Sequence, residues 1–197
     1  MKSLKMFGLI ALAALMAMAF VGGSSAMAGT HLCTADEANC AKGNIITHVH
    51  ETSVGKAILL TNTITVSCNV LFLGEVVEEG EAGQAVVEGN FTFSNCGSSC
   101  TVTEESASSR VEVEKSGHET GSVAGEGEVL VNCLGIKCFY NGKGLIGTAK
   151  GLLLSTAANG EISLQEKTVN LTKGTFCPSV RKLDITTTPL IGTHITE

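Results

Sequence analysis

Alternating hydrophobic and polar positions are the main pattern of the chain after residue 28. Ile64 and Val66 alternate with threonine, and Val111 and Val113 alternate with arginine and glutamate. Successive side chains of a strand point to opposite faces of a sheet, so this alternation predicts half-buried antiparallel strands. Helical periodicity is nearly absent, and only the segment 34–42 offers a cap-like start that could support one turn.

Glycines divide these runs at short intervals. Asn141–Gly142 and Asn159–Gly160 are typical of tight hairpin turns, because this pair accepts positive φ at low cost. The spacing predicts roughly ten to twelve short strands, as in a sandwich or a barrel. We therefore predict an all-β fold, an antiparallel sandwich or barrel stapled by disulfides, with one domain over residues 29–197.

The first 28 residues are typical of a secretory signal peptide. Lys2 and Lys5 precede an apolar run from Leu9 to Val21, and Ala26-Met27-Ala28 supplies a cleavage site before Gly29. The apolar run is shorter than the roughly 20 residues that span a bilayer. We therefore expect a secreted protein, extracellular or associated with the cell envelope, that keeps no membrane anchor after cleavage.

Charge and aromatic content narrow the range of partners. Removal of two lysines with the signal peptide takes the net charge from −6 to −8, which disfavours nucleic acid as a partner. The chain has no tryptophan and one tyrosine, so few rings are available to stack on sugars or bases. The expected partner is an extracellular or cell-envelope ligand whose identity the composition does not specify.

All eight cysteines lie after residue 28, and an even number in an exported chain predicts a disulfide framework. Short spacings favour local bridges, which leaves one distant pair. A zinc site built from Cys96, Cys100, Cys133 and Cys138 is the metal alternative, but exported thiols normally oxidise before they bind zinc. The predicted pairs are Cys33–Cys40, Cys96–Cys100, Cys133–Cys138 and Cys68–Cys177, and the rival pairing joins Cys68 to Cys96 and Cys100 to Cys177.

Two histidines are candidate metal ligands. His48 and His50 would lie on one face of a strand, with Glu51 on the other face. A third ligand would have to come from elsewhere in the chain, with His31, His118 and His194 as candidates. Isolated histidine pairs on exported β proteins are usually surface residues, so we predict no bound metal and no cofactor.

Sequence signals for catalysis are weak. Gly142–Gly147 matches the dinucleotide-binding fingerprint by letter, but that motif needs a helix after it, and a strand-like run follows here. No Gly-x-Ser-x-Gly motif is present. Glu112 and Glu114 could serve a glycosidase, but their alternation with valines places them on the wet face of a strand. We assign no catalytic residue.

Several cysteine and strand motifs carry a resemblance. Leu32-Cys33 with Cys40, Ile64 to Cys68, Asn95-Cys96 with Cys100, and Cys177-Pro178 resemble those of uncharacterised exported proteins of high-GC Gram-positive soil bacteria. The resemblance covers most of the chain after residue 28. It implies export and a β fold, and it implies no particular activity.

The leading hypothesis is a secreted or envelope-associated β protein with a binding or structural role and no catalytic activity. One alternative is an extracellular hydrolase whose site is assembled only in the fold. A second alternative is a metal-binding module at His48 and His50.

Overall fold

The structure, a computed structural model, describes residues 29–37, 40–79, 83–97, 99–151, 160–166 and 169–196. The predicted signal peptide at 1–28 lies outside these residues. Thirteen strands in antiparallel sheets make up the regular structure of the described chain, which confirms the predicted all-β fold. No helix in this part of the chain is long and apolar enough to cross a membrane. The strands are β1 (His31–Cys33), β2 (His48–Ser53), β3 (Ala57–Thr61), β4 (Thr65–Glu79), β5 (Gln84–Ser94), β6 (Cys100–Glu104), β7 (Ser109–Gly117), β8 (Thr120–Cys133), β9 (Ile136–Lys150), β10 (Glu161–Glu166), β11 (Asn170–Lys173), β12 (Val180–Pro189) and β13 (His194–Thr196).

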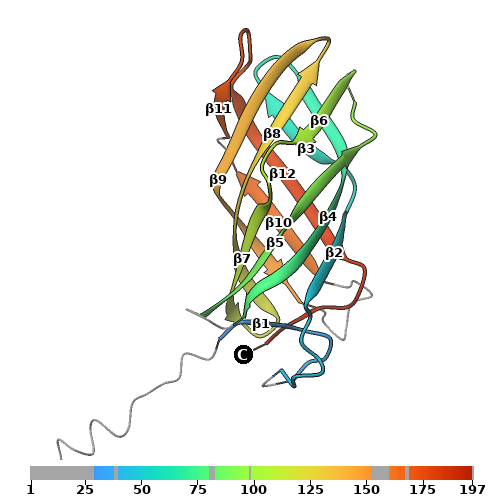
Figure 1. Cartoon of the computed structure of the whole chain (residues 1–197), viewed down its shortest axis with the longest axis vertical. Helices are drawn as coiled ribbons and strands as arrows, with labels where there is room; N and C mark the ends of the chain where they lie inside the picture. Colours follow the sequence, from blue (N-terminus) through green and yellow to red (C-terminus); the bar gives the residue numbers. More distant parts are fainter. Residues whose placement is uncertain are drawn as a thin grey trace, which may run out of the picture.

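Eleven of these strands form one sheet that closes into a barrel (Figure 1). The order around the barrel is β2, β4, β5, β7, β8, β9, β10 and β12, and pairing of β12 with β2 completes the ring. Each of the other three strands extends one position of the ring, because it pairs with the same neighbour as a ring strand does. β3 and β2 both pair with β4, β6 and β7 both pair with β8, and β11 and β10 both pair with β9. An eight-position barrel has an interior that side chains fill or that holds one small ligand.

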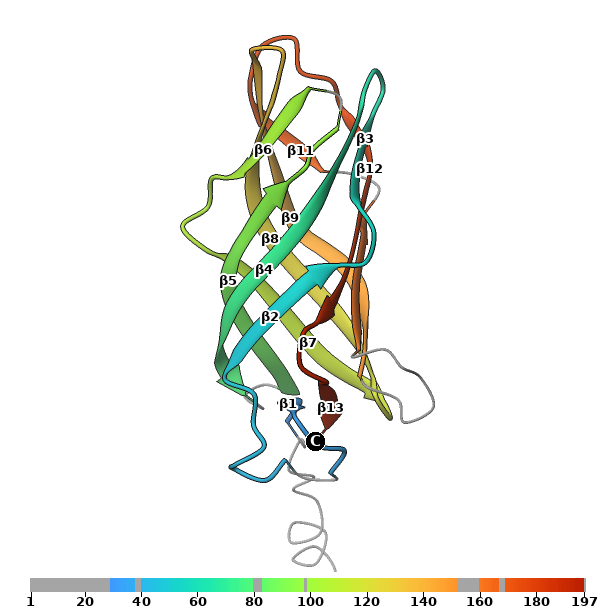
Figure 2. The same ribbon diagram turned by 90° about the vertical axis from the view of Figure 1, so that its right-hand side faces the viewer.

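The upper half of the barrel, where β3, β6 and β11 lie, separates into two sheets (Figure 2). Ladders join β12, β3, β4 and β5 in one sheet, and β6, β8, β9 and β11 in the other. Within the described residues no ladder joins β5 to β6 or β11 to β12. The molecule is therefore a closed barrel below and a pair of facing sheets above, which combines the two predicted architectures.

Alternate residues of strands such as β2, β3 and β7 are buried, as the sequence pattern predicts. Valine is the most frequent buried hydrophobic residue, in keeping with the low aromatic content. Phe72, Phe91 and Phe93 form the ring cluster, with centroid separations of 4.5 Å and 6.3 Å between successive rings. Tyr140 is buried, and its hydroxyl donates a hydrogen bond of 2.9 Å to the carbonyl of Pro178, which satisfies its polar atom.

A two-stranded sheet closes the lower end of the barrel. β1 pairs with β13 and brings the two ends of the described chain together below the barrel (Figure 1). Leu32 and Ile195 of this pair are buried. The Thr30 hydroxyl donates to the carbonyl of Gly83 at 2.7 Å and accepts from the N–H of Lys115 at 2.8 Å. These bonds fasten the terminal sheet to the lower ends of β5 and β7.

Four disulfides link the cysteines, and only one of the predicted pairs is among them. Cys33–Cys40 is present, with a Cα separation of 6.0 Å. The other bridges are Cys68–Cys96, Cys100–Cys133 and Cys138–Cys177. They replace the predicted Cys68–Cys177, Cys96–Cys100 and Cys133–Cys138, and the rival pairing is correct for Cys68–Cys96 alone.

The division of the upper half into two sheets explains why Cys96 does not pair with Cys100. Cys96 follows β5 and lies beside Cys68 of the neighbouring β4, with a Cα separation of 4.1 Å. Cys100 begins β6, where its register partner is Cys133 of β8. The segment between Cys96 and Cys100 therefore crosses from one sheet to the other, and the two cysteines belong to different sheets.

The geometry of the β8–β9 turn explains why Cys133 does not pair with Cys138. The β8–β9 hairpin turns at Leu134 and Gly135, with φ of 53° and 88°, and not over the four residues that separate Cys133 from Cys138. A two-residue turn with positive φ at both positions places Cys133 opposite Ile136. Cys138 is then free to reach Cys177 in the loop after β11.

The predicted turn at Asn141–Gly142 is also wrong, because both residues lie inside β9. Gly142 faces Gly127 of β8 across the ladder, and a Cβ there would come within 2.8 Å of the Leu145 side chain. The glycine is needed for side-chain space in a continuous strand. At the other predicted turn, Asn159 lies outside the described residues.

Non-reducing peptide mapping tests the cysteine pairing directly. We expect linked peptides for Cys68–Cys96, Cys100–Cys133 and Cys138–Cys177. A Cys100→Ser/Cys133→Ser variant should lose about 3 to 4 kcal/mol of unfolding free energy in urea, because that bridge closes a loop of 33 residues. A linked Cys96–Cys100 peptide would contradict the division into two sheets.

Candidate functional site

Glu51 is a carboxyl group that points into the barrel. It lies on β2, on the same inward-facing side of the strand as Val49 and Ser53. Its side chain lies beside the two neighbouring strands, β4 and β12. Its register partners are Phe72 on β4 and Pro189 on β12. The residue is 5 % exposed, and the Thr187 hydroxyl donates a short hydrogen bond to its Oε2.

Burial changes the ionisation of this group. Removal from water raises the pKa of Glu51 to about 7, and the hydrogen bond from Thr187 opposes that rise in part. The ion pairs of the described chain include none between Glu51 and a lysine, arginine or histidine. Near neutral pH the barrel therefore contains a carboxyl group that is about half ionised and has no protein cation beside it.

A cavity lies next to Glu51, at the lower end of the barrel. Its volume is about 270 Å³, and its wall is mostly hydrophobic. Glu51 also lines a cavity of about 20 Å³ further inside, together with Phe72 and Thr187. The wall of the larger cavity combines the first residues of β2, the start of β10, the end of β12 and the terminal sheet, including Leu32, Ile46, Val49, Ile162, Pro189 and Ile195.

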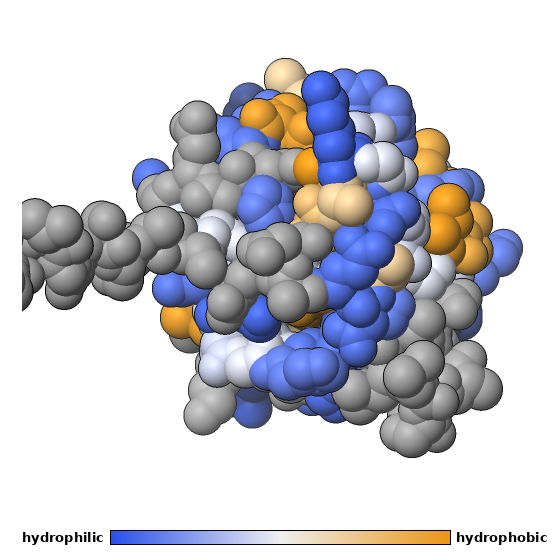
Figure 3. Space-filling model, turned by 90° about the horizontal axis from the view of Figure 1, so that it is seen from below, coloured by the Kyte–Doolittle hydropathy of each residue, from blue (hydrophilic) through white to orange (hydrophobic). Residues whose placement is uncertain are grey.

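Figure 3 views this end of the molecule from below, and hydrophilic side chains cover most of its described surface. His48, His50, Lys150 and Glu161 are the charged or titratable residues of the cavity wall besides Glu51. A hydrophobic cavity with a few polar groups and one carboxyl of raised pKa is the usual form of a small-molecule site.

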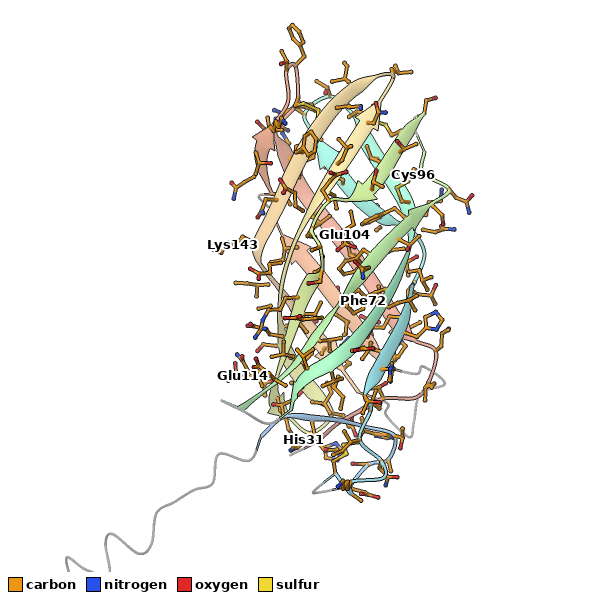
Figure 4. All side chains as sticks on the ribbon, in the orientation of Figure 1. His31, Phe72, Cys96, Glu104, Glu114 and Lys143 are labelled. Carbon is orange, nitrogen blue, oxygen red and sulfur yellow. A yellow bond between two sulfur atoms is a disulfide. The ribbon has the colours of Figure 1, made fainter. Side chains whose placement is uncertain are left out.

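A second cavity, of about 90 Å³, lies between the two sheets of the upper half. Its wall is mostly hydrophobic, with Ser109, Arg110 and Glu126 as the polar residues among those that line it. Glu104 lies in the same half, above Phe72 (Figure 4). Its carboxylate accepts the N–H of Phe91 at 2.7 Å and one short hydrogen bond from the hydroxyl of Ser109. Glu104 thus satisfies backbone where β5 and β6 form no ladder, and we assign it a structural role.

The two predicted metal ligands lie on the exposed face of β2, although both also border the lower cavity. His48 and His50 are exposed on one face of β2, as the alternation predicts, and Glu51 takes the opposite face. His48 Nε2 is 3.5 Å from a carboxylate oxygen of Glu75, and its Nδ1 bonds to Thr47. Neither histidine belongs to a cluster of three metal-ligating side chains within the described residues.

The remaining sequence candidates occupy structural positions. Gly147 of the dinucleotide-like motif lies in β9, where a Cβ would overlap the backbone carbonyl of Ser163 in β10. The glycine allows two strands to approach, and the strand continues after it to Lys150, as the prediction from context expects. Glu112 lies on the outer face of β7 and accepts a hydrogen bond of 2.8 Å from Arg110.

Glu51 is not among the site residues that the sequence predicts. The signal was the parity of β2, because Val49, Glu51 and Ser53 share the face that the strand buries. A carboxylate in a hydrophobic set marks a position where burial raises the pKa. No family model, curated protein or solved structure matches the chain, so these contacts carry the functional argument.

The raised pKa predicts a pH-dependent effect of Glu51→Gln. A carboxyl whose pKa rises from 4.5 to about 7 on folding costs no stability below pH 4.5, and the cost grows until the pH exceeds 7. The variant should therefore match the wild type at pH 4 and exceed its unfolding free energy by about 3 kcal/mol at pH 8. Urea denaturation across this range is the measurement.

Glu114→Gln, on the outer face of β7, is the matched control for the loss of one carboxylate. It should change the unfolding free energy by less than about 0.5 kcal/mol. An equal gain in both variants at pH 8 would mean that net charge, and not burial of Glu51, causes the effect.

Proposed function

We propose that this protein is an exported, non-catalytic binding protein that holds one small, mainly hydrophobic molecule in the lower cavity. The observation that carries the proposal is Glu51, a buried carboxyl without a protein cation, at the inner side of a hydrophobic cavity of about 270 Å³. Four disulfides support an oxidising compartment, and export is part of the proposal.

The cavity limits the size of the ligand. A water molecule occupies about 30 Å³ of the liquid, so the space corresponds to at least nine waters, or on the order of ten non-hydrogen atoms. The walls offer mostly hydrocarbon, including Leu32, Ile162 and Ile195. A ligand of this size with a compact hydrophobic body fits the wall chemistry.

Glu51 determines the polar end of the ligand. An ionised carboxylate that is buried without a counterion is unfavourable, and a cationic group beside it would remove that cost. A protonated amine supplies both the charge and hydrogen-bond donors. The proposed ligand class is therefore a small hydrophobic amine whose ammonium group contacts Glu51.

Cyclohexylamine tests the proposal, because it stays protonated across the relevant pH range. Binding needs the ionised carboxylate, whose fraction rises from about one tenth at pH 6 to about nine tenths at pH 8 for a pKa of about 7. We expect the affinity measured by calorimetry or NMR to increase about tenfold over this interval. Glu51→Gln should weaken binding and remove the pH dependence.

Cyclohexanol, which has the same body and no charge, is the control ligand. Its affinity should not increase between pH 6 and pH 8. The proposal fails if cyclohexylamine does not bind, or if its pH dependence persists in the Glu51→Gln protein.

A further inference from the structure

Three side chains with metal-ligating atoms meet below the barrel, away from Glu51. They are Asp36, Glu119 and His194, and their ligand atoms lie within 4.8 Å of one another. Asp36 belongs to the loop closed by the Cys33–Cys40 bridge, Glu119 to the β7–β8 turn, and His194 to β13. Three segments far apart in the sequence therefore contribute to one cluster.

Burial and backbone hydrogen bonds hold Glu119 in place. It is 2 % exposed, and its φ of 53° is unusual for a residue with a side chain of this size. Its Oε2 accepts the N–H of Ile195 at 2.9 Å, and its carbonyl accepts the N–H of Gly151 at 2.8 Å. A Cβ at Gly151 would overlap the carboxylate. The chain is thus arranged to bring this carboxylate to a buried position.

The partner of Glu119 is a buried histidine. His194 is 5 % exposed, and its Nδ1 is 2.7 Å from Oε1 of Glu119. Asp36 brings a second carboxylate, and the ion pairs of the described residues join neither acid to a lysine or an arginine. Two carboxylates with one buried imidazole leave negative charge that a cation would compensate.

The donor set suits one class of cation. One imidazole nitrogen with carboxylate oxygens is a ligand set that zinc uses, whereas calcium and magnesium prefer oxygen alone. His118, next to Glu119 on the same turn, is exposed and lies 3.8 Å from Oδ2 of Asp36 through its Nε2, but it does not belong to the cluster of three. We propose that Asp36, Glu119 and His194 bind one zinc ion that fastens both ends of the described chain to the barrel.

Binding requires a small adjustment. Two ligand atoms at about 2.1 Å from a tetrahedral zinc ion are about 3.4 Å apart. Nδ1 of His194 and Oε1 of Glu119 are 2.7 Å apart, so their hydrogen bond must open when the ion enters. Asp36 can supply the movement, because its side chain is 39 % exposed and lies in a loop. Glu119 and His194 are both buried, so the larger movement falls to Asp36. This proposal does not depend on the ligand of the lower cavity.

The test uses the oxidised full-length protein after removal of the signal peptide, stripped of metal with a chelator. Titration with Zn²⁺ followed by calorimetry should show one ion per chain, and elemental analysis after dialysis should retain it. The melting temperature should rise with Zn²⁺, because an ion that binds only the folded state stabilises it. Cobalt substitution should give visible absorption bands typical of nitrogen and oxygen ligands.

Asp36→Asn is the informative variant, because its exposed position keeps the risk of misfolding low. It should weaken Zn²⁺ binding at least tenfold and lose the rise in melting temperature. His48→Ala is the matched control, since His48 is an exposed histidine that also lies near a carboxylate. It should bind zinc as the wild type does.

Three outcomes would overturn the site. They are absence of stoichiometric zinc in the wild type, equal binding by Asp36→Asn, and loss of binding in His48→Ala. In the first two cases the contact between Glu119 and His194 is an ion pair that holds β13 and binds no metal, and in the third the ion binds on the outer face of β2.

Discussion

Pairing of β12 with β2 and β3 is the contact on which the rest of the structure depends. It joins residues near positions 50 and 60 to residues near 180 and 190, and it turns a meander with two edges into a closed ring. Closure satisfies the edge strands and creates an interior. Valine is the most frequent hydrophobic residue of that interior. Glu51 is buried, and the lower cavity is enclosed, only because the ring closes around them.

Closure is incomplete in the upper half, where other interactions replace the missing ladders. Between β5 and β6 the Glu104 carboxylate accepts the backbone N–H of Phe91. Three disulfides lie in this half: Cys68–Cys96 and Cys100–Cys133 each lie within one of the two sheets, and Cys138–Cys177 joins β9 to the loop between β11 and β12. Covalent bonds thus accumulate where hydrogen-bonded pairing is weakest, and the small hydrophobic cavity lies between the sheets they strengthen.

The lower half places its unusual polar groups differently. Glu51 faces the lumen with a hydroxyl as its protein partner, which is why burial dominates its pKa. Glu119, in the β7–β8 turn, and His194, in the terminal sheet, contact each other below the barrel. The position of Glu51 in the lumen is suited to a ligand that binds and dissociates. The contact between Glu119 and His194 is suited to a lasting link between the chain ends and the barrel. The terminal sheet connects them, because Leu32 and Ile195 also line the lower cavity.

The sequence by itself determined the strand content, the inward and outward faces of the strands and the outward position of His48 and His50, because side-chain direction alternates within a single strand. It also determined the local Cys33–Cys40 bridge. Only the tertiary structure decided the other three bridges, the inward carboxylate site and the meeting of Asp36, Glu119 and His194. Those depend on which strands become neighbours and on where a chain changes sheets. Alternation, which repeats identically on every strand, carries no information about either.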